Sequence, residues 1–136
     1  MISRYCLPEM KKIWSKENRF QQMLQVEIFA CEAMRDMGAL DPEIFQEIKE
    51  KASFDIQRIA EIEEVTKHDV VAFLMAVTEK IGEENAKYLH RGLTASDILV
   101  TSLSVQMKQA AELILGKLYT LRDVLVELAK EHKYHL

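Results

Sequence analysis

Apolar residues recur every three or four positions along most of this chain, the spacing that places them on one face of an α-helix. The first long stripe lies between Ser15, a helix-capping residue type, and Gly38, a helix-terminating one. Its members are Phe20, Leu24, Glu27, Ile28 and Cys31. No segment shows a convincing strand alternation, so the pattern predicts an all-α protein.

Caps and breaks divide much of the remaining chain into shorter helices. We expect them over residues 8–14, 42–51, 70–81 and 83–91, with a further helix ending near residues 67–68. Either Ser53 or Asp55 can open that further helix, and Asp69 is the predicted cap of the next one. The residues expected to face inward from the further helix are Ile56, Ile59, Ile62 and Val65.

The last helix is predicted to be unusually long. Thr94, Ser96 and Asp97 are alternative caps, and the helix can continue to about Lys130, which gives a length of about 50 Å at ~1.5 Å per residue. Such a helix is longer than a compact globule of this size is wide, so we expect its far half to pack on something this chain does not contain. Its stripe comprises Leu99, Leu103, Met107, Ala110, Leu113, Leu118, Leu121, Val124 and Leu128.

Composition narrows the class of protein. The chain has 136 residues, of which 49% are hydrophobic and 29% charged, as in a folded domain. A net charge of −4 argues against general nucleic-acid binding. We expect no membrane association, because no apolar run approaches the ~20 residues of a span and no secretory signal follows the N-terminus. Cys6 and Cys31 are expected to be free thiols in a cytoplasmic protein.

Two short polar segments lie at predicted helix boundaries. Residues 66–69 read Thr-Lys-His-Asp, and His68 there stands between the cation Lys67 and the carboxylate Asp69. A histidine so placed can move a proton or hold an anion, and the neighbouring carboxylate can fix its tautomer. The alternative is an ordinary helix junction in which Asp69 caps and His68 has no chemical role.

The second segment, residues 90–97, reads His-Arg-Gly-Leu-Thr-Ala-Ser-Asp. Gly92 and the hydroxyl cluster precede a long helix, whose free N–H groups and positive dipole end suit a phosphate or carboxylate. The alternative is plain N-capping. Arg4 and Tyr5 form a third candidate, since a guanidinium beside a phenol suits a phosphate. The alternative there is a frayed terminus.

His132 and His135 lie three positions apart and could face one metal ion. Because no carboxylate or cysteine partner was identified nearby, we predict no metal site.

Taken together, these segments resemble the adenylosuccinate lyases of the fumarase/aspartase superfamily. The two polar segments, in this order, are the specific part of the resemblance. The other matching residues are Arg4-Tyr5, Pro8-Glu9-Met10, Ile13-Trp14, Glu17-Asn18-Arg19-Phe20, Glu27-Ile28, Ala52-Ser53-Phe54-Asp55 and Val70-Val71-Ala72-Phe73.

The resemblance implies a reaction that needs neither metal nor organic cofactor. Members of the family eliminate fumarate from adenylosuccinate, giving AMP, and from the succinyl-carboxamide ribonucleotide of purine synthesis. A base removes a proton beside a carboxylate and an acid protonates the departing nitrogen. The substrate is a small purine nucleotide with a phosphate and two carboxylates, so the site should be rich in cations and hydrogen-bond donors.

The resemblance also assigns residues. Arg4 and Tyr5 match the pair that contacts the phosphate. His68, within the segment Lys67-His68-Asp69, is expected to orient the substrate or act on the acid side, with His90 as the second histidine. Residues 94–96 match the segment that holds a substrate carboxylate, which in this chain reads Thr94, Ala95 and Ser96. The family more often has Ser or Thr where Ala95 stands, so a side-chain contact there is replaced by a backbone one.

Two segments of the family do not occur in this sequence. One is a Gly-Arg-Thr-His-Gly segment that carries the better candidate for the general acid, and the other is a mobile serine loop that carries the base. The resemblance therefore implies an N-terminal helical lyase domain over residues 1–93, followed by the first long helix of an incomplete central bundle domain over residues 94–136. In the family that bundle forms a homotetramer, and each active site draws on three subunits. We expect the isolated chain to be inactive.

Two other functions remain open on the sequence alone. Another lyase of the superfamily, such as one acting on argininosuccinate, shares the helical pattern, although Arg4 and Tyr5 favour a phosphorylated substrate. A non-catalytic helical module could instead bind a partner through the exposed stripe of Leu113, Leu121 and Leu128.

Overall fold

The computed structural model describes residues 3–135, so the outermost ends of the two predicted domains, residues 1–2 and 136, lie outside it. The described part is helical, with no strand, which confirms the all-α prediction. After a 3₁₀ turn, η1 (Ser3–Tyr5), the elements are α1 (Pro8–Ile13), α2 (Lys16–Asp36), α3 (Pro42–Lys51), α4 (Ile56–Thr66), α5 (Asp69–Ile81), α6 (Glu83–Ala86) and α7 (Ala95–Glu131).

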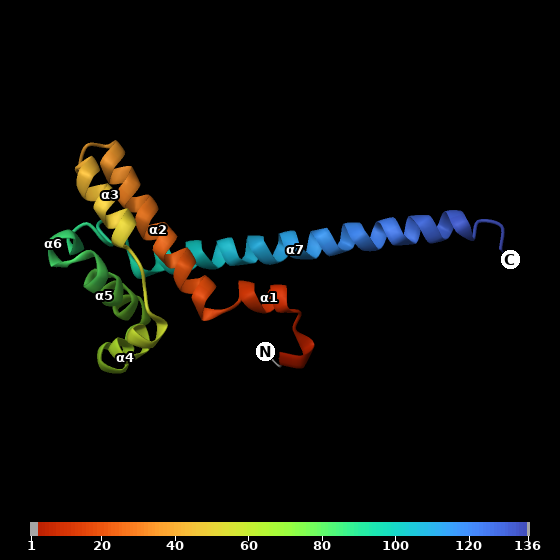
Figure 1. The fold of residues 1–136 in the computed structure, drawn as a ribbon, viewed down its shortest axis with the longest axis horizontal. Coiled ribbons are helices and arrows are strands. Elements are labelled where there is room, and N and C mark those ends of the chain that lie inside the picture. The colour runs from red at the N-terminus through yellow and green to blue at the C-terminus, as the bar shows by residue number, and fades with distance from the viewer. Residues whose placement is uncertain (1–2, 136) are drawn as a thin grey trace.

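The helices form a compact head and a projecting rod. Figure 1 shows α2 to α6 gathered at one end, while α7 leaves this group and extends alone to the far end of the molecule. The short helix α1 lies alongside α7, outside the head. The first half of α7 packs against α2, which ties the rod to the head.

Three phenylalanine rings mark the centre of the head. Phe20 on α2 stacks on Phe73 of α5, with ring centroids 5.8 Å apart, and Phe54 from the α3–α4 connection lies 5.9 Å from Phe20. Around them the apolar sides of α3, α4 and α5 close the core. Its most deeply buried members include Met23, Ile48, Ile59, Ala72, Phe73 and Ile98. This core holds the α4–α5 junction rigidly against the start of α2.

The structure corrects three details of the sequence prediction. A helix was expected over residues 83–91, but α6 ends at Ala86 and the chain continues in turns, with a left-handed backbone at His90. Val65 was expected to face inward from α4, but it is 83% exposed, because the helix passes beyond the core before it ends. Asp69 was expected to cap α5, but it is the first residue of that helix, and His68 is the N-cap. Asp55, rather than Ser53, opens α4 by accepting from the backbone N–H groups of the first turn.

The long last helix is present as predicted, with 37 residues. Two polar contacts attach it to the N-terminal helices: the Gln106 amide donates to the Ile13 carbonyl at the end of α1 at 2.7 Å, and the Asn18 amide of α2 donates to Gln109 at 2.8 Å. The last fully buried side chain of α7 is Ala110. The exposed apolar residues beyond it are Ile114, Leu115, Leu118, Tyr119, Leu121, Val124, Leu125, Val126 and Leu128.

No helix of the described residues has the length and hydropathy that crossing a bilayer requires. The two cysteines are both unpaired, with Cys6 half-buried and Cys31 fully buried.

The burial of Cys31 predicts a loss of stability at alkaline pH. Burial, assisted by the nearby Glu27 carboxylate, raises the pKa of the Cys31 thiol from 9.0 to about 11. Between these values the unfolded chain has released the thiol proton and the folded chain has not, so the free energy of unfolding falls as pH rises. We expect a slope of about 1.4 kcal/mol per pH unit from this group.

The measurement is urea unfolding under reducing conditions at several pH values across this window. Cys31→Ala is the matched variant, because the other alkaline groups titrate equally in both proteins. The variant should start less stable, since it leaves a small void, and then lose less stability on going to high pH. Parallel pH profiles would contradict the assignment.

Candidate functional site

A polar pocket of about 450 Å³ opens where the α4–α5 junction meets the start of α2. His68, Lys67 and Asp69, which the sequence analysis singled out, line it from the junction. Lys16 and Arg19 line it from the first turn of α2. The remaining lining residues are Phe20 and Glu63. Three cations and a histidine therefore border one opening, together with two carboxylates.

His68 occupies the pocket wall because it caps α5. Its Nδ1 accepts a hydrogen bond from the backbone N–H of Val71 at 3.4 Å, and the side chain is half-exposed. Thr66 steadies the turn, since its hydroxyl lies 3.4 Å from the His68 backbone nitrogen and 3.3 Å from its carbonyl. An acceptor at Nδ1 places the proton of the neutral ring on Nε2. The N–H donor of the neutral ring is therefore Nε2.

The charges beside His68 are already partly paired. Arg19 meets Asp69 at 2.6 Å across the pocket, and Lys67 meets Glu64 at 3.1 Å on its own helix. Lys67 itself adopts a left-handed backbone conformation, with φ of 52°, where α4 ends. A bidentate anion can compete for Arg19 and Lys67, because the Lys67 pair is solvent-exposed and weak and the Arg19 pair is only partly buried.

His90 is held against α2 farther along the helix, at Glu27. The carboxylate of Glu27, which is 1% exposed, accepts from the His90 backbone N–H at 2.7 Å and meets the ring Nδ1 at 2.9 Å. His90 also has a left-handed backbone, with φ of 58°. These contacts fix the connection between α6 and α7 against the buried side of α2.

The N-terminus of α7 follows directly. Thr94 is the N-cap, and the Asp97 carboxylate accepts from the Thr94 backbone N–H at 2.7 Å and from its hydroxyl at 3.0 Å. These bonds lower the pKa of Asp97, chiefly through the Thr94 backbone, and the nearby His90 lowers it further. Ala95 is half-buried and Ser96 is exposed in the first turn of the helix. The first backbone N–H groups of α7 point out of the helix end.

Arg4 and Tyr5 lie elsewhere. The Arg4 guanidinium sits over the Tyr5 ring, 4.9 Å from its centroid. Tyr5 borders a separate, apolar pocket of about 380 Å³ between the N-terminal segment and the middle of α7. Its lining residues are Tyr5, Cys6, Leu7, Met10, Leu113, Ile114, Lys117, Leu118 and Leu121. The pocket that His68 lines therefore does not include Arg4 or Tyr5.

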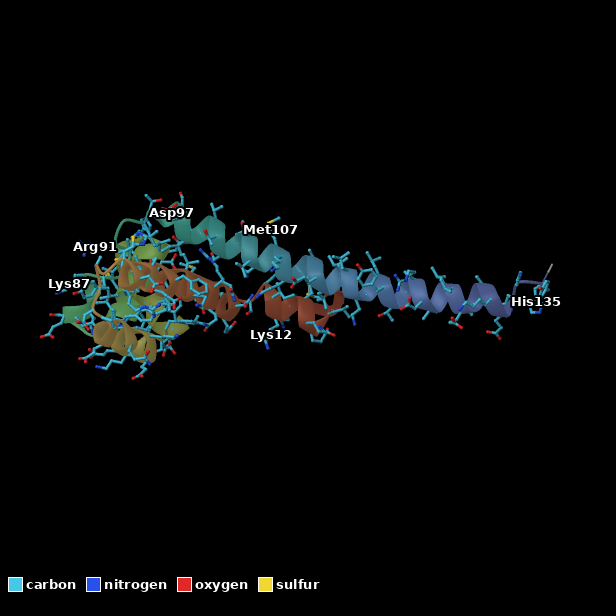
Figure 2. All side chains as sticks on the ribbon, turned by 90° about the horizontal axis from the view of Figure 1, so that it is seen from above. Lys12, Lys87, Arg91, Asp97, Met107 and His135 are labelled. Carbon is cyan, nitrogen blue, oxygen red and sulfur yellow. The ribbon has the colours of Figure 1, made fainter. Side chains whose placement is uncertain are left out.

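Figure 2 shows how far the polar groups are spread. Arg91 and Asp97 lie together at the start of α7, and His135 lies at the opposite end of the molecule. The rings of His132 and His135 approach to 2.9 Å between their Nδ1 atoms. Among the described residues, no group of three or more His, Cys, Asp and Glu side chains is placed to hold a metal ion.

Sequence reasoning missed three residues of this region: Lys16, Arg19 and Glu27. The first two are a helical turn apart in α2, a spacing that puts them on one face, but nothing local says that this face meets the α4–α5 junction. Glu27 was placed correctly on the buried stripe of α2. A carboxylate at a core position is itself a signal, because it requires a buried partner.

With this geometry established, comparison with known proteins identifies the family. The family model described as Lyase matches residues 4–136. The chain belongs to this lyase family.

The most informative relatives are bacterial enzymes. The adenylosuccinate lyase of Bacillus subtilis is 52% identical over 134 residues, covering 98% of this chain and 31% of that enzyme. Those of Streptococcus mutans and Staphylococcus saprophyticus are 47% and 46% identical, again over 31% of their length. The chain thus spans about a third of the curated relatives it matches.

A solved structure carries the same fold. The crystal structure of a fumarate lyase from Mesorhizobium matches with a TM-score of 0.81 at 22% identity, covering 90% of this chain and 29% of that one. This likeness supports the long α7 and the helical head as a shared architecture.

The Asp97 cap predicts a pH-dependent stability. Because its pKa is lowered in the folded protein, its contribution is present above the unfolded pKa of about 3.8 and is lost as pH falls through the folded value. We expect Asp97→Asn to unfold at lower urea concentration than the wild type near neutral pH, with the gap closing in acid.

Asp123→Asn is the matched control on the same helix, since Asp123 pairs only with its neighbour Arg122 on the exposed surface. It should leave the urea midpoint nearly unchanged at every pH. An Asp97→Asn deficit of equal size at acidic and neutral pH would contradict the capping account.

Proposed function

We propose that this chain is part of an adenylosuccinate lyase. The observation that best supports this proposal is the 52% identity to an enzyme of that name along 98% of the chain, which includes the whole His68 segment. The reaction is a β-elimination that releases fumarate from adenylosuccinate, giving AMP, or from the succinyl-carboxamide ribonucleotide. The family implies a small nucleotide substrate for the chain.

The His68 pocket supports this proposal through its chemistry. The substrate carries several negative charges, and Lys16, Arg19 and Lys67 offer cations around one opening. The Nε2–H group of His68 donates to the substrate, which suits a residue that orients it or assists the departing nitrogen. Asp69 holds Arg19 in position until an anion replaces it. No step here uses a metal or organic cofactor.

The other candidate segments require a shared site. Thr94, Ala95 and Ser96 provide helix N-terminal N–H groups and hydroxyls for a carboxylate, and Arg4 with Tyr5 provides a phosphate contact. Since Tyr5 lines a different pocket from His68 in one copy, and Arg4 lies over the Tyr5 ring, we propose that copies of the chain complete each other's sites. A cytoplasmic homotetramer with residues 94–136 as its central domain is the corresponding assembly.

The exposed face of α7 supports assembly. Beyond Ala110 its apolar residues recur over a wide stripe, whereas Glu112, Asp123 and Lys130 recur on the other side. A contiguous apolar surface of this kind is a self-association site in water. The occupant we propose is α7 of another copy.

The first test of the function is turnover. Protein expressed from the native reading frame, including any sequence beyond residue 136, should convert adenylosuccinate to AMP and fumarate, measured by absorbance. His68→Ala should lower kcat by about 10²- to 10⁴-fold, the usual contribution of a positioned proton-transfer or donor group. The 136-residue chain alone should release no fumarate.

Val65→Ala is the matched control, because Val65 lies at the same junction but is exposed and outside the pocket. It should retain wild-type turnover. Failure of the longer protein to release fumarate, or normal turnover by His68→Ala, would overturn the proposal. Release of fumarate from argininosuccinate in its place would identify the related lyase.

The test of the assembly uses Leu121→Glu. A charge within the apolar stripe should disrupt packing between copies and reduce the molar mass measured by light scattering to that of one chain. Lys130→Glu introduces the same side chain on the polar side of α7 and should leave the mass unchanged. A wild-type chain that is monomeric at high concentration, or a Leu121→Glu variant of unchanged mass, would refute self-association through this face.

A further inference from the structure

The buried carboxylate of Glu27 has no role in the chemistry described so far. It lies at the centre of α2, 1% exposed, among the apolar residues of the core. A carboxylate in such a place is retained only when donors satisfy it. Here both oxygens are used by one residue, His90, which is 63 positions away in the sequence.

The donor in the first of these two hydrogen bonds is the backbone N–H of His90. Oε2 accepts from the His90 backbone N–H at 2.7 Å, and a backbone amide can only donate. The second oxygen, Oε1, lies 2.9 Å from Nδ1 of the same residue. An ionised carboxylate can only accept, so Nδ1 must carry the hydrogen. The neutral ring of His90 then has no hydrogen on Nε2.

The outer nitrogen is available to a ligand. No described residue forms a hydrogen bond with Nε2 of His90, and about a quarter of the side chain is exposed, 26%. Since no buried side-chain nitrogen or oxygen of the described residues lacks a partner, Nε2 must reach the surface. It does so at the connection that leads into α7, four residues before the Thr94 cap.

His68 has the opposite arrangement. Its Nδ1 accepts from the Val71 backbone N–H, so its neutral ring carries the hydrogen on Nε2. The two histidines that the sequence singled out therefore present different groups: His68 offers a donor and His90 offers an acceptor. Backbone capping determines the first tautomer, and a buried carboxylate determines the second.

We propose that Glu27 is a positioning residue that holds His90 as the Nδ1–H tautomer and so makes Nε2 the hydrogen-bond acceptor presented to a ligand. The ligand group that matches is a hydroxyl or an N–H donor, such as a ribose hydroxyl or a base amino group. The two hydrogen bonds to Glu27 also compensate for the energetic cost of the left-handed backbone at His90. That backbone conformation holds the ring in this direction. The consequence for turnover rests on the proposed lyase function.

The direct test is long-range ¹H–¹⁵N NMR of the histidine rings at a pH at which imidazoles are neutral. The chain contains four histidines, and His90→Ala and His68→Ala assign the two signals of interest. In the wild type, His90 should show a protonated Nδ1 and His68 a protonated Nε2. His68 thus acts as an internal reference for the other tautomer. A His90 signal protonated at Nε2 in the wild type overturns the proposal without any Glu27 variant.

Glu27→Gln makes the test sharper. The carbonyl of the substituted amide can accept from the His90 backbone N–H, which leaves the amide NH₂ group facing Nδ1 and forces that atom to accept. The proposal therefore predicts that this near-isosteric change switches His90 to the Nε2–H tautomer while His68 stays unchanged. Glu32→Gln, on the same helix but paired with Arg35 and away from His90, should alter neither ring. An unchanged His90 tautomer in a folded Glu27→Gln protein would refute the positioning role.

Turnover separates this inference from the proposed function. In the longer protein, Glu27→Gln should lower kcat at least about tenfold, as loss of a tautomer-fixing carboxylate does elsewhere, while Glu32→Gln should not. Tautomers as predicted in a protein without lyase activity would uphold the positioning role and reject the function. Lyase activity with unaltered kcat in Glu27→Gln would uphold the function and reject the catalytic consequence of the positioning.

Discussion

The bonds between Glu27 and His90 are the constraint on which the layout of this protein depends. A carboxylate in the middle of the buried side of α2 is tolerated because a single residue supplies both of its donors. That requirement fixes the backbone at His90 in a left-handed conformation, which is about 1–2 kcal/mol less favourable for a residue with a side chain. The chain then turns at Gly92, and α7 starts against α2 rather than elsewhere. One buried polar contact thus connects the core of the head to the direction of the rod.

The helix α7 extends beyond the head, so the apolar face of its far part is exposed. Contacts of α7 with α1 and α2 run through Gln106 and Gln109 and extend to Lys117, which pairs with Glu9 of α1. An isolated helix gains little stability from its own hydrogen bonds, so a helix of this length with a wide apolar face is stabilised by packing. The same geometry separates Arg4 and Tyr5 from His68. Association of chains along α7 is one explanation for both the exposed apolar face of α7 and the separation of Arg4 and Tyr5 from His68.

Local signals predicted most of the fold. Ser15, Asp41 and Gly82 marked helix ends correctly because capping and positive φ depend on a few neighbouring residues. Val65 was misplaced because periodicity continues past the point at which a core ends. Asp69 was wrongly predicted as the cap of α5 because both it and His68 can cap a helix. The actual cap, His68, lies one residue earlier. Its carboxylate is instead committed to Arg19, 50 positions away.

The candidate site was predictable only in part for the same reason. The motif residues His68 and His90 are local and were visible, whereas Lys16, Arg19 and Glu27 join them only through tertiary packing. A sequence shows that a histidine is present, but its tautomer is set by whatever faces Nδ1. For His68 that partner is a backbone amide three residues away, and for His90 it is a carboxylate on a different helix. Two like residues in one protein thereby acquire opposite hydrogen-bonding roles, and the difference arises from the fold rather than from the motif.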